Sequence, residues 1–254
     1  MRMEVKLIQG DCLVEMDKLI DAGVKVDAII GDLPYGTTAC SWDEIIPFAP
    51  MWERVNKINN GVFVTTASQP FTSKIVMSNI ENFREEIIWE KERPSNIFLM
   101  QKRHGKTHEN IEVFCETGNY TYNPIATKNG KNRTREAMQK YVGNKLKHQD
   151  GKSVTSYRDD WDGSVSQPRS VIYYVRDSGE ENHPTQKPVA LYEYLIRTYT
   201  NEGDTVLDFT CGSGTTGVAC VNTNRNCILI DKYQHWIDVS TKRIHDAQQQ
   251  MRLF

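Results

Sequence analysis

The sequence predicts an α/β protein built around a mostly parallel sheet with helices on both faces. Strand-like and helix-like patterns alternate at both ends of the chain, and several strand-like segments are nearly continuous apolar runs. Two of these runs lead directly into turns rich in glycine or proline that carry acidic residues. Continuous apolar runs are typical of parallel strands buried on both faces, and their alternation with helices indicates crossover connections.

The elements follow from hydrophobic periodicity, with short β-branched runs read as strands and apolar spacings of three and four residues read as helices. The predicted strands are Glu4–Gln9, Val26–Gly31, Gly61–Thr66, Phe83–Glu90, Asn110–Cys115, Thr205–Asp208 and Cys227–Asp231. The predicted helices are Cys12–Ile20, Trp52–Lys57, Val189–Tyr199, Thr215–Val221 and His235–Gln249.

The middle of the chain differs in character from both ends. Gly, Asn, Lys and Ser dominate residues 117–167, and their apolar spacing is irregular. A connection of this length inside a compact domain is usually functional or disordered. We therefore expect one α/β domain formed by residues 1–116 and 168–254, with residues 117–167 as an insert.

Composition is that of an ordinary globular protein, with 39% hydrophobic and 25% charged residues among 254. No apolar run approaches the ~20 residues that span a membrane, and the N-terminus lacks the features of a signal peptide. The six cysteines include no CxxC pair and no zinc spacing with histidine, which favours reduced thiols and no metal. These features predict a cytoplasmic protein.

Positive charge gathers in the middle although the net charge is −2. Residues 128–158 contain nine Lys or Arg, and residues 91–106 contain five more. Such clustering fits either a cationic face for phosphate groups or a solvated loop. The candidate phosphate contacts are Lys128, Lys131, Arg133, Arg135, Lys145 and Lys147.

The first chemical motif is Gly31-Asp32-Leu33-Pro34-Tyr35-Gly36, directly after a predicted strand. Ligands of open α/β sheets bind beyond the carboxyl ends of the strands, where Asp32 would lie. A carboxylate, the Pro34 carbonyl and the aromatic ring of Tyr35 suit a flat base that bears an amino group. Asp, Pro and Gly are also the commonest turn formers, so an ordinary turn remains the alternative.

The second motif joins a strand to a helix through Asp208-Phe209-Thr210-Cys211-Gly212-Ser213-Gly214-Thr215-Thr216. The two glycines permit close approach of a ligand at the positive end of the helix dipole. About twenty residues later the next strand ends in Asp231, where an acid can bind ribose hydroxyls. The absence of GK[ST] disfavours ATP hydrolysis, so a nucleoside cofactor without a phosphate fits better.

Two smaller motifs lie near other element ends. His183-Pro184-Thr185-Gln186-Lys187-Pro188 precedes a predicted helix, and Lys187 is a candidate for holding a ligand carboxylate. Gly10-Asp11-Cys12 follows the first strand, where Asp11 either accepts from an adenine amine or caps the helix.

Together these motifs resemble the DNA amino-methyltransferases that modify adenine N6 or cytosine N4, in particular the beta group, whose catalytic motif precedes its cofactor motif. Asp11 and Cys12 match a stretch that contacts the cofactor adenine, residues 32–35 match DPPY, residues 183–188 match HPTQKP, and residues 208–216 match DPFxGSGTT. Asp231 stands where Glu is usual. The resemblance covers roughly residues 1–115 and 168–245, and the insert falls where the family keeps its target-recognition region.

The resemblance implies a Rossmann-like, seven-stranded fold with permuted motif order that uses S-adenosyl-L-methionine. It implies catalytic roles for Asp32, Pro34 and Tyr35. The implied cofactor contacts are Asp11, Cys12, Lys187, Asp208, Thr210, Gly212, Ser213, Gly214, Thr215 and Asp231. Leu33 replaces the first proline of DPPY, and Phe209-Thr210 replaces Pro-Phe.

Double-stranded DNA is the implied substrate, with the target base flipped out of the stack. Asp at the first catalytic position mostly accompanies adenine in this family, whereas Ser mostly accompanies cytosine. N4-cytosine methylation, RNA or protein amide methylation and a non-catalytic modification subunit remain alternatives. The basic insert within the chain argues against an obligatory specificity subunit, and the sequence leaves homodimerisation open.

Overall fold

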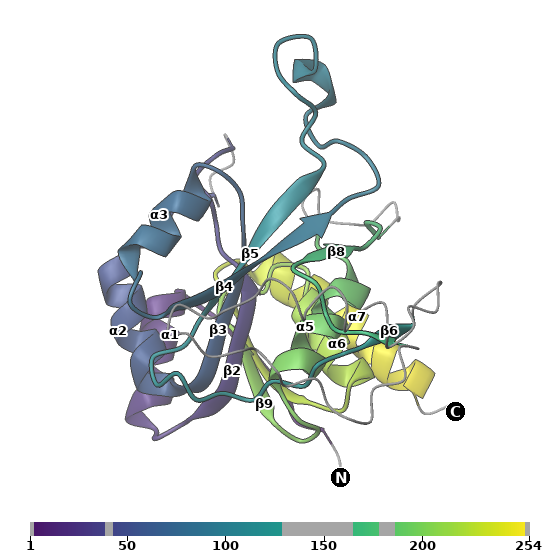
Figure 1. Ribbon diagram of the computed structural model, residues 1–254. Coiled ribbons are helices and arrows are strands. Elements are labelled where there is room, and N and C mark those ends of the chain that lie inside the picture. The colour runs from purple at the N-terminus through teal and green to yellow at the C-terminus, as the bar shows by residue number, and fades with distance from the viewer. Residues whose placement is uncertain (1–2, 39–42, 129–164, 178–185, 252–254) are drawn as a thin grey trace, which may run out of the picture. The chain divides into compact units, whose positions relative to one another are not determined.

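The computed structural model describes residues 3–38, 43–128, 165–177 and 186–251 (Figure 1). It divides into two compact units, one formed by residues 1–123 and 170–254 and the other by residues 124–169. In the second unit the described residues form a short antiparallel ladder between β6 (Thr127–Lys128) and β7 (Val165–Ser166). The first unit contains the main sheet and all the described helices.

Most strands and helices of the first unit lie close to predicted positions, whereas α3 and β8 were not predicted. Its strands are β1 Val5–Gln9, β2 Val26–Asp32, β3 Asn59–Ala67, β4 Phe83–Glu90, β5 His108–Phe114, β8 Val171–Tyr173, β9 Thr205–Asp208 and β10 Asn226–Asp231. Its helices are α1 Cys12–Asp21, α2 Phe48–Ile58, α3 Phe71–Ser78, α5 Val189–Tyr199, α6 Thr215–Asn222 and α7 Gln234–Met251, with a 3₁₀ turn at Ile97–Leu99.

The sheet has the strand order β1-β10-β9-β2-β3-β5-β4-β8. All neighbouring pairs are parallel except the two made by β5, which runs antiparallel to β3 and β4. The expectation of a mostly parallel α/β sheet is confirmed. The expected number of seven strands is corrected to eight among the described residues, because the short strand β8 pairs with β4.

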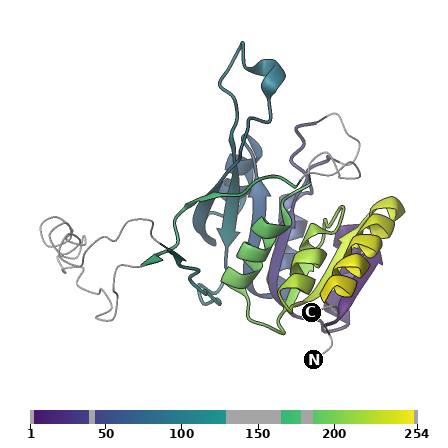
Figure 2. The ribbon, with the colours of Figure 1, turned by 90° about the vertical axis from the view of Figure 1, so that its right-hand side faces the viewer.

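Helices cover both faces of the sheet, as predicted. In Figure 1, α1, α2 and α3 lie on one side of the strands, and α5, α6 and α7 lie on the other. The first layer packs Met16, Trp52 and Phe71 onto the sheet, and the second packs Leu195 and Ile244 onto the opposite face. Figure 2 shows α5, α6 and α7 side by side. The two cores fix the strand ends from which the site is built.

Buried thiols contribute to these cores. Cys115, Cys211, Cys220 and Cys227 are buried, and Cys12 is partly buried; all five are free. Among the helices that the structure describes, none has the length and apolarity required to cross a bilayer.

Candidate functional site

Four neighbouring strands bring acidic residues to one edge of the sheet. Gln9 at the end of β1 pairs with Asp231 on β10, and Leu229 on β10 pairs with Asp208 on β9. Asp32 ends the next strand, β2. Asp11, Asp32, Asp208 and Asp231 all line one cleft of about 1220 Å³. The two chemical motifs, 176 residues apart at Asp32 and Asp208, therefore meet in one site.

The glycine-rich loop lies against the end of β10. The Gly212 amide donates to Asp231 Oδ2 at 3.0 Å, and Tyr233 N donates to Asp231 Oδ1 at 2.9 Å. Gly212 has φ +49°, and the space beyond its Cα is open, so a ligand can approach its backbone. Gly214 has a different role, because a Cβ there would meet Ser240 of α7 at 2.7 Å.

Asp208 is buried beneath this loop. Its carboxylate accepts from Thr210 N at 3.0 Å and from the Thr216 hydroxyl. Burial raises the pKa of Asp208 to about 7. A Cβ on Gly31 would lie 2.6 Å from Asp208 Oδ1, so the glycine allows β2 and β9 to approach closely. These contacts fix the loop relative to the catalytic strand.

The other proposed cofactor residues surround the same half of the cleft. Asp11 caps α1 by accepting from Leu13 N at 3.0 Å and Val14 N at 3.3 Å, which confirms the capping interpretation. Burial raises the pKa of the neighbouring Cys12 thiol to about 11, so it remains protonated. Tyr233 and Trp236, which follow Asp231, also line the cleft and were missed in the sequence. Two aromatic rings near an acid and an open glycine turn suit a nucleoside.

Ser213 and Thr215 connect the glycine-rich loop to the segment before α5. Ser213 Oγ donates to Gln186 Oε1 at 3.1 Å, and Thr215 Oγ1 donates to the Lys187 carbonyl at 3.4 Å. These bonds place Lys187 at the junction of the two motifs. Residues 183–185 of the same motif lie outside the described residues.

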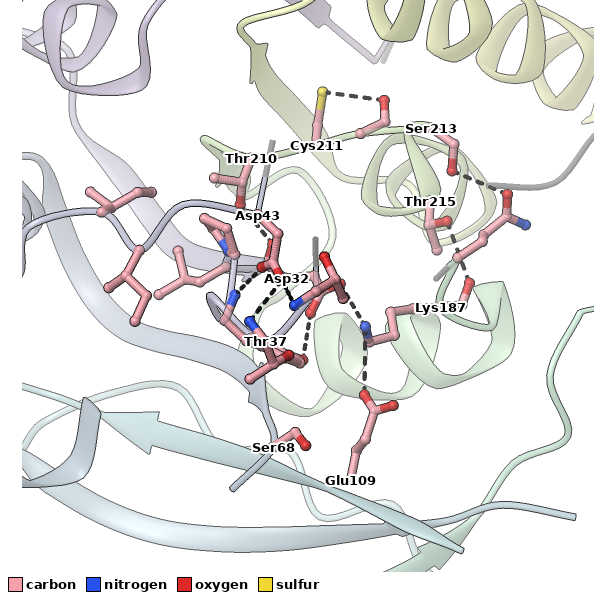
Figure 3. A pocket seen from close by; sticks show the side chains of 18 of the residues that line it. Asp32, Thr37, Asp43, Ser68, Glu109, Lys187, Thr210, Cys211, Ser213 and Thr215 are labelled. Atoms are coloured by element: carbon pink, nitrogen blue, oxygen red, sulfur yellow. Dashed lines mark hydrogen bonds and ion pairs between the residues drawn. The ribbon is translucent and has the colours of Figure 1, made fainter. Parts of the chain in front are cut away.

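Asp32 is the central acceptor of the second half of the cleft. Its Oδ1 accepts from Tyr35 OH at 2.7 Å and from the Thr66 hydroxyl. Its Oδ2 accepts from Lys187 Nζ at 2.5 Å (Figure 3). A carboxylate oxygen has two acceptor positions. Among the described contacts, Oδ2 therefore retains one position for an incoming N–H. The side chain of Asp32 is 27% exposed and lines the cleft, so a ligand in the cleft can reach this carboxylate.

Lys187 is buried between two carboxylates. Its Nζ lies 2.5 Å from Asp32 Oδ2 and 3.5 Å from Glu109 Oε2 (Figure 3). Lys91 forms a further ion pair with Glu109. Burial opposes the charge of Lys187, but Asp32 and Glu109 raise its pKa above the usual range. Burial likewise opposes ionisation of Glu109, and Lys187 and Lys91 lower its pKa. Positive and negative side chains therefore alternate in the order Lys91, Glu109, Lys187 and Asp32.

The contacts of Lys187 differ from those expected from the sequence. The sequence suggested a ligand carboxylate, whereas the ammonium contacts Asp32 and Glu109. Sequence reasoning missed Glu109 because it considered only the carboxyl ends of strands. β5 runs antiparallel to β3, so the residue near its amino end lies at the same edge as Asp32.

A second missed residue, Asp43, organises the loop after β2. Its two oxygens accept from the backbone N–H groups of Tyr35, Gly36, Thr37 and Thr38 at 2.7 to 2.8 Å. Burial alone would raise the pKa of Asp43, but the hydrogen bonds from Gly36, Thr38 and Thr37 lower it. One carboxylate thus fixes four successive amides next to Pro34.

The departures from the family motifs have structural explanations. Leu33 is buried in the core beside α1 and α2, so an apolar side chain can replace proline there. Phe209 is buried and stacks on Phe63, with ring centroids 6.1 Å apart. Thr210 Oγ1 donates to the Asp32 carbonyl at 3.1 Å and so joins the two motifs. Pro34 and Tyr35 both line the cleft.

Most of the proposed phosphate contacts lie outside the described residues. The exception is Lys128, whose backbone belongs to β6. The second basic segment, residues 91–106, is described and contributes several residues to the wall of the cleft. The assignments of Lys131, Arg133, Arg135, Lys145 and Lys147 remain predictions.

The fold and site define a DNA methylase. The family whose model matches residues 26–242 is the N6/N4 methyltransferase family, described as DNA methylase, and the match spans most of the chain. The chain belongs to this family. The DNA adenine methyltransferase YhdJ of Escherichia coli (strain K12) is 28% identical over 260 residues, which cover 95% of this chain and 83% of that protein.

Other relatives agree with this placement. The type II methyltransferase M.HpaI of Haemophilus parainfluenzae is 48% identical over 75 residues, covering 30% of this chain and 24% of that protein. The crystal structure of the M1.HpyAVI–SAM complex has a TM-score of 0.63 and 25% identity, covering 94% of this chain and 99% of that one. The PvuII DNA methyltransferase (cytosine-N4-specific) has the same fold, with a TM-score of 0.63, 16% identity and coverage of 98% and 92%.

Proposed function

We propose that this DNA methylase transfers a methyl group from S-adenosyl-L-methionine to adenine N6 in double-stranded DNA. The observation that carries the proposal is the accessible acceptor position on Asp32 Oδ2, beside Pro34 and Tyr35 in a cleft shared with the glycine-rich loop. Asp at this position and the similarity to an adenine methyltransferase support adenine. We place the activity in the bacterial cytoplasm, where the DNA is.

The cofactor half of the cleft fits S-adenosyl-L-methionine. Gly212 offers open backbone, Asp231 ends β10 next to it, and Tyr233 and Trp236 add aromatic surface. We assign the other contacts to Asp11, Cys12, Thr210, Ser213 and Thr215, with Asp208 and Gly214 supporting the loop. When bound, the cofactor supplies a methyl group on a sulfonium, which is already activated for transfer.

The chain's own residues then orient the amine and stabilise its changing geometry. The lone pair of an exocyclic amine is delocalised into the base ring. Acceptance of its two N–H hydrogens by Asp32 and the Pro34 carbonyl favours the more tetrahedral nitrogen of the transition state. Lys187 holds the Asp32 carboxylate in place, and Tyr35 OH donates to it. Burial and Asp32 raise the pKa of Tyr35, so it remains a neutral donor.

Residues 117–167 are the proposed target-recognition insert. Their cations, including Lys128, would contact phosphates, and affinity for DNA should fall steeply as salt is raised. Because this region belongs to the same chain, we propose that no separate specificity subunit is needed.

The test is methyl transfer to genomic DNA that lacks prior methylation, followed by digestion to nucleosides and mass analysis. We expect N6-methyladenine. N4-methylcytosine would preserve the site chemistry but overturn the choice of base. Absence of modification in DNA, with the cofactor bound, would overturn the proposed function and direct attention to RNA, protein or a missing subunit.

A further inference from the structure

The hairpin between β4 and β5 forms an arm whose tip is apolar and exposed. Residues 91–107 extend beyond the sheet in Figures 1 and 2. At the tip, Ile97, Leu99 and Met100 are exposed, and Phe98 is fully exposed. Four consecutive large apolar side chains at a loop tip do not stabilise the fold by burial, and an exposed apolar cluster of this kind marks an interaction site.

The arm is an ordered structure that holds this tip out. At its base, Lys91 N donates to the Thr107 carbonyl at 2.7 Å, and Ser95 N donates to the Lys106 carbonyl at 3.0 Å. Asn96 bridges the two sides, since its Oδ1 accepts from Lys106 N at 2.6 Å and its Nδ2 donates to the His104 carbonyl at 3.1 Å.

Backbone hydrogen bonds also close the tip itself. Leu99 N donates to the Asn96 carbonyl at 2.9 Å, and Lys102 N donates to the Leu99 carbonyl at 2.9 Å. Gly105 allows the two sides to approach, because a Cβ there would meet Pro94 at 3.0 Å and Met100 at 3.1 Å. Phe98 is therefore presented on a closed turn.

Cations surround the apolar tip. Between Glu92 and Glu109 the sequence contains no acidic residue, whereas it contains the cations Arg93, Lys102, Arg103 and Lys106. Lys102 and Arg103 are exposed, and within the described part of the chain neither forms an ion pair. A protein partner with a purely apolar surface would leave these cations unexplained. A nucleic acid accounts for both features, because its phosphates attract cations and its stacked bases have apolar faces.

The arm is continuous with the catalytic cleft. Ser95, Asn96, Arg103, His104 and Lys106 line the same cleft as Asp32. Lys106 reaches the Ser68 hydroxyl, just beyond the end of β3. Whatever contacts the arm is therefore next to the position where the reacting base must enter.

We propose that the arm is a DNA wedge, in which Phe98 and its apolar neighbours insert into the base stack beside the target while Lys102 and Arg103 bind flanking phosphates. This inference rests on the proposed function. Apolar side chains inserted at a base step unstack it at a cost of a few kcal/mol, which lowers the remaining cost of flipping the target.

The test compares wild type with Phe98→Ala on two duplexes that carry the site mapped from wild-type modification. One duplex is fully paired, and the other has the target base mismatched and so already weakly stacked. Phe98→Ala should reduce kcat/KM at least about tenfold on the paired duplex and by less than about threefold on the mismatched one. Phe98→Leu should retain most activity, because leucine also serves as a wedge.

Met77→Ala is the matched control. Met77 is an exposed apolar residue on α3 outside the arm, so its replacement should leave kcat/KM on both duplexes unchanged.

A Lys102→Gln/Arg103→Gln variant tests the phosphate contacts. It should reduce the slope of log affinity against log salt by about 1.8, or about 0.9 for each phosphate contact. Two results would overturn the wedge but not the proposed function. One is an equal loss of kcat/KM on both duplexes with Phe98→Ala. The other is a sedimentation coefficient of the DNA-free protein that changes with Phe98→Ala, because the tip would then hold two copies of the protein together. Failure of the wild type to modify any DNA would overturn the proposed function and the wedge with it.

Discussion

Asp43 shows how a single carboxylate can set the geometry of a catalytic loop. It accepts four successive backbone N–H groups and so fixes the conformation of Tyr35 and Gly36 beside Asp32. Peptide amides that converge on one carboxylate form an anion-binding concavity, here satisfied from within the chain. The effect reaches the chemistry because Tyr35 OH donates to Asp32.

Replacing Asp43 with Asn should therefore impair catalysis more than cofactor binding. An amide has one acceptor oxygen, so two of the four N–H groups lose their partner, which should cost about 1–3 kcal/mol of unfolding free energy. We expect kcat to fall about tenfold or more through misplacement of Pro34 and Tyr35. Denaturant unfolding and steady-state kinetics measure both quantities.

Glu53→Gln provides the control for Asp43→Asn. Glu53 is an exposed carboxylate on α2 that pairs with Lys57, and such surface pairs contribute little. If Asp43→Asn has the stability and turnover of this control, the four hydrogen bonds to Asp43 do not determine the conformation of the loop.

At the scale of single residues, the sequence located the groups that follow strands and missed those placed by tertiary structure. Asp32, Asp208 and Asp231 were found because each ends a parallel strand. Asp43 gave no signal, because nothing in a sequence shows which amides a loop carboxylate will meet. Glu109 required knowledge that β5 runs antiparallel.

Among the strands of the main sheet and the helices that cover it, all but α3 and β8 were predicted from the sequence. The predicted strand Thr205–Asp208 and helix Val189–Tyr199 have the observed bounds. α3 was missed because its eight residues contain few turns and, unlike those of the equally short α6, follow no recognisable motif; β8 was missed because it has three residues. The omission of β8 explains why the sheet has one more strand than expected.

The arm between β4 and β5 also belongs to the scale of elements. Its basic composition was visible in the sequence, but its exposure was not. A run such as Ile97–Met100 reads as a candidate for the core, and only the closed hairpin shows that it projects from the protein. The charge pattern gains meaning from this position, because Arg103 and Lys106 line the cleft.

The stability of the whole molecule should depend on buried carboxyl groups. Burial and the nearby Glu86 raise the pKa of Glu112 to about 8, and burial raises that of Asp208 to about 7. Such groups bind a proton more tightly in the folded state. Their stabilising contribution is complete below the unfolded pKa and is lost as pH rises through the folded pKa.

We therefore expect the free energy of unfolding to decrease between about pH 5 and pH 9. Glu112 is fully buried, and both of its oxygens lack hydrogen-bond partners among the described residues. Glu112→Gln cannot ionise, so its stability relative to wild type should rise by about 3–5 kcal/mol across this range, about 1.4 kcal/mol for each pH unit below the folded pKa of about 8. Denaturant unfolding as a function of pH measures the difference.

The exposed Glu81→Gln, in the turn before β4, should reproduce the wild-type pH curve. If Glu112→Gln and wild type lose stability in parallel as pH rises, Glu112 is not the group that titrates.

The central claim is that Asp32 activates an amine of DNA inside a site that binds S-adenosyl-L-methionine independently. The most direct measurement is transfer of labelled methyl to unmethylated genomic DNA by wild type and Asp32→Ala, with cofactor affinity measured by calorimetry on the same samples. We predict labelled N6-methyladenine with the wild type, a loss of at least about 10³-fold with Asp32→Ala, and cofactor affinity within about twofold of wild type. Normal turnover by Asp32→Ala would contradict the account.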